Sequence, residues 1–337
     1  MKEMRLLLPG IWDSGGLFVA MKFTELTNEI IPTRIFTYVD KEKEYPFVDM
    51  KALPEDEEII WAITWGPHIN RLLDRLGDRK VIYYAQSTCW GNLHVDGIPI
   101  LCVSRFVMSH FAKHAPTSPL YLVEPALDPN CRNMGSDRDI DVLCVSRKST
   151  EYLDKILVPK LQKKLKVHIQ NEFIPRDKLY ELYNRSKVYL YSSQQPPFGL
   201  GDGFGLQPLE ALVCGCTVFS NLHGGLSDYL DPEVCGYKLE TFSLEYDVNR
   251  ILKKVREYSA ENSKSEYLRQ KYSIKSFNDK MKVIWPEIED FLQTKNRAPQ
   301  TLISDLCAQR PSLYFRARKR LRNGLAKTGP LKRRERF

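Results

Sequence analysis

The segment 199–220 holds the residues of this chain that are best placed to do chemistry. It begins with glycine at four alternate positions, which are Gly199, Gly201, Gly203 and Gly205. Because glycine has no Cβ, the backbone of such a loop can approach a ligand closely. A helix is predicted to follow from Pro208, whose missing N–H costs nothing in a first helical turn. Loop amides and a helix N-terminus together suit an anionic ligand such as a diphosphate.

Two carboxylates bracket the core of this loop. Asp202 precedes Gly203, and Glu210 is predicted to lie in the first turn of the helix. A helix dipole favours a carboxylate at that point, so Glu210 also has a purely structural interpretation. A plain surface turn needs one or two glycines rather than four, and this difference favours a ligand site.

The run D-G-F-G-L-Q-P-L-E-A-L-V-C-G-C-T-V-F-S-N, followed by H-G-G-L, resembles the donor-site signature of retaining family 4 glycosyltransferases, which have the GT-B fold. That signature has two acids separated by seven residues around a G-F-G-L core. The resemblance implies that Glu210 binds the ribose hydroxyls of a nucleotide. It implies that Asp202 contacts the transferred sugar, where the family usually has Glu. One missing methylene shortens the reach of Asp202 by roughly 1.5 Å.

The same resemblance assigns further donor-site residues. The backbone of four residues would face the sugar and the phosphates: Gly203, Phe204, Gly205 and Leu206. Less closely, His223, Gly224 and Gly225 match a later loop of the donor pocket. In the family, an Arg at the end of a strand and a Lys farther along hold the diphosphate. Arg147 fits the first position, and Lys148 and Lys155 are the alternatives for the second.

These residue types fit the chemistry of sugar transfer. Cleavage of the anomeric C–O bond places negative charge on the leaving diphosphate, which fixed cationic and amide donors stabilise in the transition state. Asp202, Arg147 and Lys155 are therefore the candidate catalytic residues. No Asp-x-Asp metal motif flanks a predicted strand, so we expect a metal-independent enzyme with no cofactor beyond a UDP-, GDP- or dTDP-linked sugar.

In the first part of the chain, Gly15 and Gly16 follow the first predicted strand, where the family places a glycine loop that faces the acceptor. Gln86 stands where the family often has a catalytic His. His94 lies nearby in the sequence. It is either a substitute for that His or a solvated loop residue. Arg105 resembles the Arg or Lys of a Ser-Arg or Ser-Lys pair that opens a helix in this family. It is equally explained as an ordinary helix N-terminal residue that does not contact the donor.

Length and composition fit a soluble globular protein. The 337 residues allow two domains of ordinary size, and 43% of them are hydrophobic. No window approaches the ~20 apolar residues of a membrane-spanning helix, and the N-terminus reads as a strand and a loop rather than a signal peptide. The eight cysteines form no C-x-x-C pair. We expect buried thiols in a reducing compartment and a cytoplasmic protein.

Short β-type runs alternate with helical patterns, as in parallel α/β sheets. Predicted strands are 5–8, 35–39, 59–64, 81–85, 100–104, 120–123, 141–146, 166–170, 187–191 and 217–220. Predicted helices are 18–26, 69–76, 106–113, 153–165, 178–186, 208–214, 243–258 and 276–292. The polar stretch 128–139 is predicted to be an exposed linker. The predicted architecture is GT-B, with two facing Rossmann-like domains: an acceptor domain (1–130) and a donor domain (138–292).

A basic tail, 293–337, is predicted to follow these domains. From residue 310 onward it carries a charge of about +10, and apolar residues recur every four positions at Leu313, Ala317, Leu321 and Leu325. A helix there would have one apolar and one basic face, which suits an anionic membrane surface. The alternative is a disordered basic tail. No aromatic-studded basic groove accompanies it, so nucleic acid is not the expected partner.

Taken together, the sequence predicts a glycosyltransferase of cell-envelope polysaccharide, lipopolysaccharide or glycolipid biosynthesis that retains the anomeric configuration. It is predicted to be cytoplasmic, with possible peripheral contact at the inner face of the membrane. Two alternatives stay open: a GT-B sugar-nucleotide epimerase, and a nucleotide-sugar-binding protein with little or no catalysis. An NAD-dependent dehydrogenase is excluded, because no G-x-G-x-x-G follows the first strand.

Overall fold

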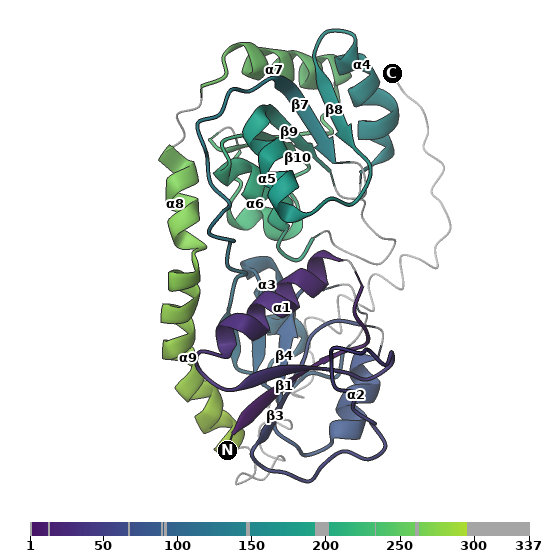
Figure 1. Ribbon diagram of the computed structural model, residues 1–337, viewed down its shortest axis with the longest axis vertical. Coiled ribbons are helices and arrows are strands. Elements are labelled where there is room, and N and C mark those ends of the chain that lie inside the picture. Colours follow the sequence, from purple (N-terminus) through teal and green to yellow (C-terminus); the bar gives the residue numbers. More distant parts are fainter. Residues whose placement is uncertain are drawn as a thin grey trace, which may run out of the picture. The chain divides into compact units, whose positions relative to one another are not determined.

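The computed structural model describes residues 2–12, 14–66, 68–88, 90, 93–145, 149–192, 202–232, 234–259 and 263–294. The first half of the described chain forms a parallel sheet with the strand order β2-β1-β3-β4-β5-β6 (Figure 1). Its strands are β1 (Glu3–Leu8), β2 (Thr33–Thr37), β3 (Ile59–Ile63), β4 (Val81–Ala85), β5 (Ile100–Cys102) and β6 (Leu120–Leu122). The central strands are buried along their whole length, as expected when helices cover both faces of a parallel sheet.

A second parallel sheet follows, with the strand order β11-β10-β9-β7-β8. Its strands are β7 (Ile140–Val145), β8 (Val167–Gln170), β9 (Ser186–Tyr191), β10 (Thr217–Ser220) and β11 (Gly236–Lys238). The strand order of each sheet reverses beside its first strand, which is β1 in one sheet and β7 in the other. In open α/β sheets, ligands bind outside the carboxyl ends of the strands at such a reversal.

Helices connect the strands and cover the sheets. They are α1 (Gly15–Thr27), α2 (Ile69–Leu76), α3 (Arg105–His114), η2 (Tyr152–Leu157), α4 (Val158–Gln162), α5 (Arg176–Arg185), α6 (Leu206–Val213), η3 (Gly224–Asp228), α7 (Leu244–Arg256), α8 (Ser263–Lys271) and α9 (Ile274–Thr294).

The alternation of side chains along the strands explains how the second sheet is covered. Val142 and Leu190 share a core with residues of α4 and α7, whereas Leu143 and Tyr189 lie in the other core, with residues of α5 and α6. Successive residues of a strand point to opposite faces, so each strand contributes to both cores. The fold is therefore α/β with two parallel Rossmann-like sheets, as predicted.

Most predicted elements agree with the structure to within two residues, and α2 and β4 agree at both ends. The predicted helix 153–165 differs, because its first part, η2, is a π-helix that continues into α4. Pro159 lies just after this change and has no N–H to complete an ordinary helical hydrogen bond. The short strand β11, the helix α8 and the 3-10 turn η3 were not predicted.

The connection between the two sheets is only partly as predicted. Residues 128–139 form no helix or strand, but the stretch is not simply exposed. Cys131 is completely buried, with its Sγ 3.8 Å from the Sγ of Cys214 in the segment after α6. Arg138 donates hydrogen bonds to the backbone carbonyls of Tyr183 and Ser186. The polar composition of the stretch concealed these two anchors. The six cysteines that the structure describes are free and buried, as expected.

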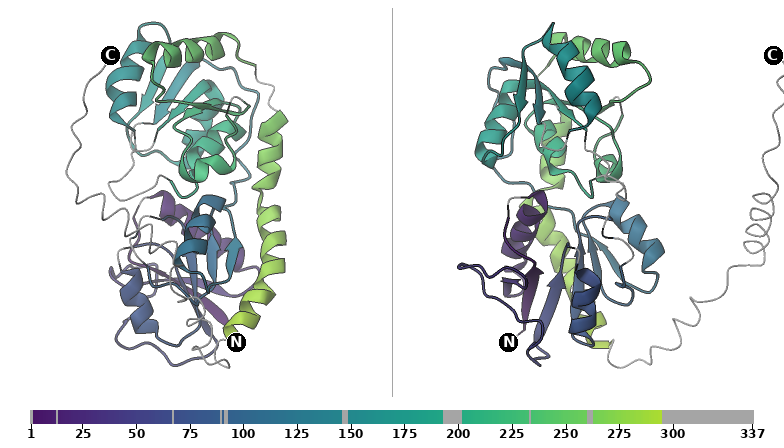
Figure 2. Two further views of the ribbon diagram at one scale, coloured as in Figure 1. Left: turned by 180° about the vertical axis from the view of Figure 1, so that it is seen from behind. Right: turned by 90° about the vertical axis from the view of Figure 1, so that its right-hand side faces the viewer.

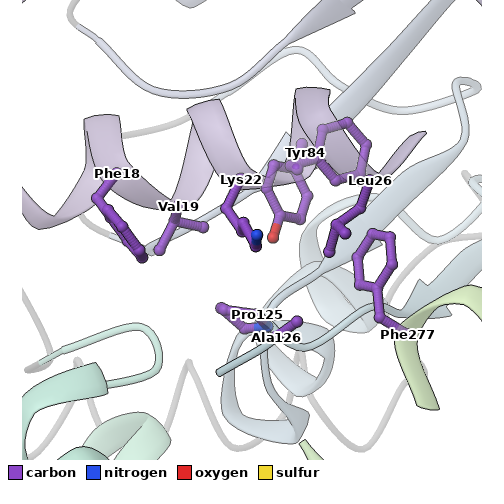
Figure 3. A pocket seen from close by; sticks show the side chains of 9 residues that line it. Phe18, Val19, Lys22, Leu26, Tyr84, Pro125, Ala126 and Phe277 are labelled. Atoms are coloured by element: carbon purple, nitrogen blue, oxygen red, sulfur yellow. The ribbon is translucent and has the colours of Figure 1, made fainter. Parts of the chain in front are cut away.

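The C-terminal helices link the two halves. Helix α8 packs against α6 beside the second sheet, and α9 packs against α1 beside the first (Figures 1 and 2). Phe277 of α9 meets Phe23 of α1 edge to face, at 6.2 Å between ring centroids. Figure 3 shows that Phe277 closes a small apolar pocket lined by α1 and by Tyr84. The predicted domain boundaries remain a prediction, and α9, which was assigned to the second domain, contacts the first sheet's helix.

None of the described helices is both long and apolar enough to cross a membrane. The basic tail beyond residue 294 lies outside the described residues, and its membrane contact stays a prediction.

The packing of α9 on α1 gives a stability prediction. Phe277 is 5% exposed, and replacing it with alanine should lower the free energy of unfolding by about 3–5 kcal/mol, because a cavity replaces the ring. Urea denaturation measures the change. Val283→Ala on the same helix is the control, since Val283 is 68% exposed and its loss should cost less than about 0.5 kcal/mol. Equal losses in the two variants would show that α9 is not docked through Phe277.

Candidate functional site

The loop from Asp202 to Gly205 leads directly into α6. Gly205 has a φ of 81° and occupies the N-cap position, so the helix starts at Leu206, two residues earlier than predicted. No side chain caps this end of the helix, which leaves its first amides available to a ligand. Glu210 is consequently the fifth residue of α6, and its predicted place in the first turn is wrong. The helix dipole therefore does not explain this carboxylate.

Asp202 is held at both its backbone and its side chain. Its carbonyl accepts a hydrogen bond of 2.8 Å from the amide of Gly225, and its Oδ2 accepts one from the hydroxyl of Tyr191, the last residue of β9. Burial and the nearby Asp202 carboxylate raise the pKa of Tyr191 well above its usual value, so Tyr191 stays a neutral donor. Asp202 is itself only partly buried. The arrangement fixes the orientation of a short carboxylate that a ligand can still reach.

Glu210 is 1% exposed and forms an ion pair with Arg176, the first residue of α5. The hydroxyl of Tyr180 lies 3.3 Å from the same carboxylate oxygen, Oε1. The other oxygen, Oε2, is buried and has no hydrogen-bond partner among the described residues. Leaving a buried carboxylate oxygen without a hydrogen-bond partner costs free energy. A ligand hydroxyl that donates to Oε2 would offset this cost. The predicted ribose contact of Glu210 stays a prediction that rests on Oε2.

Arg176 also contacts the first half of the chain. Its guanidinium lies over the ring of Phe18 in α1, 3.4 Å from the ring centroid. A cation over an aromatic face is stabilised by the ring's quadrupole. Sequence reasoning missed Arg176 and Tyr191, because neither belongs to the glycine-rich motif. In the sequence, Arg176 is marked only by the preceding Pro175, which favours a helix start. Tyr191 is marked only by its place at the end of a predicted strand.

Gly203 brings the loop from Asp202 to Gly205 against the first sheet. A Cβ at this position would lie 1.9 Å from the backbone carbonyl oxygen of Gln86, which follows β4. Ser104, which follows β5 and caps α3, donates its hydroxyl to the carbonyl of Gly203. A Cβ on Gly225 would lie 2.1 Å from the same carbonyl oxygen. The loop from Asp202 to Gly205 is therefore in direct contact with the residues after two first-sheet strands, with the backbone after β4 and with the Ser104 hydroxyl after β5.

The predicted glycine pair of the first half lies at the start of α1, which Ser14 caps by accepting a hydrogen bond of 3.0 Å from the Leu17 amide. Gly15 faces open space. Gly16 faces the indole nitrogen of Trp65 and the carboxamide oxygen of Gln86, at 3.1 and 3.3 Å from the position of a Cβ. The structure thus places Gly16 against the side chain of Gln86 and Gly203 against its backbone carbonyl.

Of the three predicted diphosphate-binding residues, the structure describes Lys155 alone. Arg147 and Lys148 lie outside the described residues, and their assignments stay predictions. The Lys155 side chain is 68% exposed and forms an ion pair of 2.6 Å with Glu151 one helical turn earlier. That contact raises the pKa of Lys155. Within the part of the chain that the structure describes, no contact joins Lys155 to Asp202 or Glu210.

Further polar groups meet at the carboxyl edge of the second sheet. His223 lies 2.7 Å from the amide nitrogen of Asn221. Glu240, after β11, accepts hydrogen bonds from Thr150 and Ser192. Two non-glycine residues here have left-handed backbones, Leu222 with a φ of 55° and Glu240 with a φ of 59°. Such conformations are costly and cluster at functional sites. No sequence motif indicated Glu240.

The two weaker candidates of the first half have local roles. The amide of Arg105 donates to the carboxylate of Asp228 at 2.7 Å. Burial raises the pKa of Asp228. His94 is exposed, and its amide donates to Asn70. Among the described residues, no group of three or more His, Cys, Asp or Glu side chains is arranged to hold a metal ion. Metal independence remains a prediction.

The second sheet and its helices resemble a known family. Residues 151–273, which include the Asp202 to Glu210 segment, match the family model described as Glycosyl transferases group 1. A search of curated proteins found no match.

Solved structures share the fold over most of the chain. Anabaena HepE in complex with UDP-glucose is 10% identical, with a TM-score of 0.60 over 85% of this chain and 100% of that one. Sucrose-phosphate synthase from Thermosynechococcus elongatus is 10% identical, with a TM-score of 0.61 over 86% and 100%. A glycosyltransferase from Rickettsia africae is 13% identical, with a TM-score of 0.59 over 85% and 98%. At these identities the likeness shows the GT-B fold.

The contact at Gly203 leads to a prediction. Gly203→Ala should lower the free energy of unfolding by about 1–3 kcal/mol, because its Cβ meets backbone rather than a movable side chain. Thermal and urea unfolding measure the loss. Gly15→Ala is the matched control for stability, since nothing lies within 4 Å of its Cβ position. If Gly203→Ala is as stable as Gly15→Ala, the described contact with Gln86 does not exist in solution.

His223 gives a pH prediction. Burial lowers its pKa from the usual 6.5, while Asp202 and Glu240 partly oppose the shift and Lys238 adds to it. Between the lowered and the usual pKa the unfolded chain binds more protons, so His223 destabilises the fold as the pH falls through that range. His223→Gln should therefore lose less stability than the wild type between about pH 7.5 and about pH 5.5. His94→Gln is the exposed control, and an identical effect in both variants would refute the assignment.

Proposed function

We propose that this chain is a glycosyltransferase that moves a sugar from a nucleotide-sugar donor to a polysaccharide, lipopolysaccharide or glycolipid acceptor with retention of configuration. The observation that carries the proposal is the Asp202–Tyr191 pair beside the uncapped N-terminus of α6. The match of residues 151–273 to Glycosyl transferases group 1 supports it. So does the fold shared with HepE, which was crystallised with UDP-glucose.

Different residues bind different parts of the nucleotide-sugar donor in this proposal. The amides of Gly203 to Leu206 and the first turn of α6 present N–H donors to a diphosphate, and the positive end of the helix dipole stabilises its charge. These donors also stabilise the additional charge that develops as the anomeric C–O bond breaks. Arg147 and Lys148, which follow β7 in the sequence, complete the diphosphate site in this proposal.

Asp202 positions the transferred sugar. Its carboxylate accepts from a sugar hydroxyl while Tyr191 holds the other side of the group, so that the anomeric carbon is oriented toward the acceptor. Glu210 accepts a ribose hydroxyl at Oε2 while Oε1 stays on Arg176. The donor loop packs against the loop after β4, so the acceptor approaches from the first sheet.

A second candidate function is nucleotide-sugar binding without turnover. The engagement of Glu210 by Arg176 favours it, because the carboxylate has one oxygen left rather than two for a ribose. Isothermal titration with nucleoside diphosphates distinguishes the candidates when it is combined with a turnover assay.

The test is release of nucleoside diphosphate from a panel of UDP-, GDP-, ADP- and dTDP-sugars with a lipid extract as acceptor. We expect release from one donor class. Asp202→Asn should lower kcat/KM about 10- to 100-fold, because a hydrogen bond to a charged group contributes about 1.5–3 kcal/mol. Asp202 is a better target than Glu210, whose loss would leave Arg176 without its partner in the structure and confuse folding with function.

Asp279→Asn is the control for the same chemical change at an exposed site. Release that is equal in both variants would remove Asp202 from the mechanism. Binding of a nucleoside diphosphate to the folded wild type without release from any donor would support the binding-protein function instead.

A further inference from the structure

Aromatic side chains gather on the loops that follow the first three strands of the first sheet. Trp12 follows β1, Tyr38 follows β2, and Trp65 and His68 follow β3. The rings of Trp12 and Trp65 meet edge to face at 5.1 Å between centroids, and those of Tyr38 and His68 at 6.1 Å. We call these four residues the aromatic cluster. It lies at the carboxyl ends of neighbouring parallel strands, where α/β sheets bind ligands.

Three polar atoms of the aromatic cluster are buried without a partner among the described residues: Trp65 Nε1, Tyr38 Oη and His68 Nδ1. Each such atom costs about 1–3 kcal/mol if nothing else satisfies it. Trp65 is only 9% exposed, so its indole N–H is not solvated as a surface group would be. Buried polar groups in proteins are nearly always paired, and three orphans in one cluster indicate a ligand that supplies the missing partners.

Glycines make room for the aromatic cluster. A Cβ on Gly10 would lie 2.4 Å from the Asp40 carboxylate and 2.9 Å from the Trp12 ring, so both groups rest against this glycine. Gly66 has a φ of 135°, and its Cβ position is 3.4 Å from the Tyr38 hydroxyl. Trp12 is 44% exposed and Asp40 is exposed as well. A partly exposed indole therefore stands beside an exposed carboxylate.

The aromatic cluster is connected to the proposed donor site through Gln86. Its carboxamide donates 2.8 Å to Thr64, the residue before Trp65, and its carboxamide oxygen shares the Gly16 surface with the Trp65 indole nitrogen. The backbone carbonyl of Gln86 lies against Gly203. A single residue thus separates the aromatic cluster from the loop that begins at Asp202.

We propose that the aromatic cluster, with Asp40, is an acceptor subsite that binds a neutral saccharide residue. The proposal rests on the proposed function and names the chemistry of its acceptor. A pyranose ring has one face of C–H groups that packs on an aromatic ring, and hydroxyls at its rim that both donate and accept. Asp40 accepts from a hydroxyl, and the Trp65 and Tyr38 groups donate to others.

Other acceptor chemistries fit less well. A phosphate would meet the negative charge of Asp40 directly beside Trp12. An alkyl chain would leave the buried indole, phenol and imidazole groups of the aromatic cluster without partners. A saccharide satisfies both the ring face and the polar atoms.

Saturation-transfer difference NMR tests the subsite on the full chain without any donor. The probes are the methyl glycosides of glucose, galactose, mannose and N-acetylglucosamine, with glycerol 3-phosphate as an anionic, non-saccharide probe. We expect transfer to at least one glycoside, strongest at the protons of one ring face. Trp12→Ala should reduce that signal at least about fivefold, because the exposed indole face is lost. Trp12→Phe, which keeps a ring, should restore part of it.

Phe242→Ala is the matched control, because Phe242 is a fully exposed aromatic residue before α7 in the second half of the chain. The proposal is overturned if no glycoside gives a signal that depends on Trp12, if Phe242→Ala loses as much signal, or if only glycerol 3-phosphate binds. This result is separate from the donor assay. Glycoside binding in a chain that releases no nucleoside diphosphate would keep the subsite and reject the transferase.

Discussion

The contact of Gly203 with the carbonyl of Gln86 is the constraint on which the site depends. Two backbones approach so closely there that no side chain other than hydrogen fits, and Gly225 repeats the condition on the other side of the donor loop. The Ser104 hydroxyl donates a hydrogen bond to the Gly203 carbonyl, against which Gly225 also packs. Because the contact is made by backbone, it fixes the loop more rigidly than a pair of movable side chains could.

That rigidity gives the two acids of the motif different roles. Asp202 lies in the fixed loop, partly exposed, and is oriented by a neutral Tyr191 hydroxyl. Glu210 lies on α6, fully buried, and its charge is balanced by Arg176. A buried carboxylate requires such a partner, whereas a half-exposed one does not. One carboxylate of the motif is therefore left partly exposed, whereas the other is mostly engaged inside the protein.

Among the described residues, the loops that follow the strands of the two sheets carry different side chains. Trp12, Tyr38 and Trp65 lie in the loops that follow strands of the first sheet, whereas Asp202, His223 and Glu240 lie in the loops that follow strands of the second. In the proposed function, the aromatic residues with Asp40 would hold the glycan acceptor, and the acids with the amides of α6 would hold the nucleotide-sugar donor. The parallel order of both sheets puts all these loops at the carboxyl edges.

The sequence alone determined the α/β class and nearly all strands, and it located the glycine-rich loop before α6, because hydrophobic period and glycine spacing are local signals. It misplaced Glu210 within α6, because the left-handed Gly205 that starts the helix early has no distinct sequence signature. It could not show the partners of the motif acids, because Arg176 is 34 residues from Glu210 and Tyr191 is 11 from Asp202. Only the tertiary structure decided these contacts and the burial of Cys131, because pairing across strands and helices depends on how the whole chain packs.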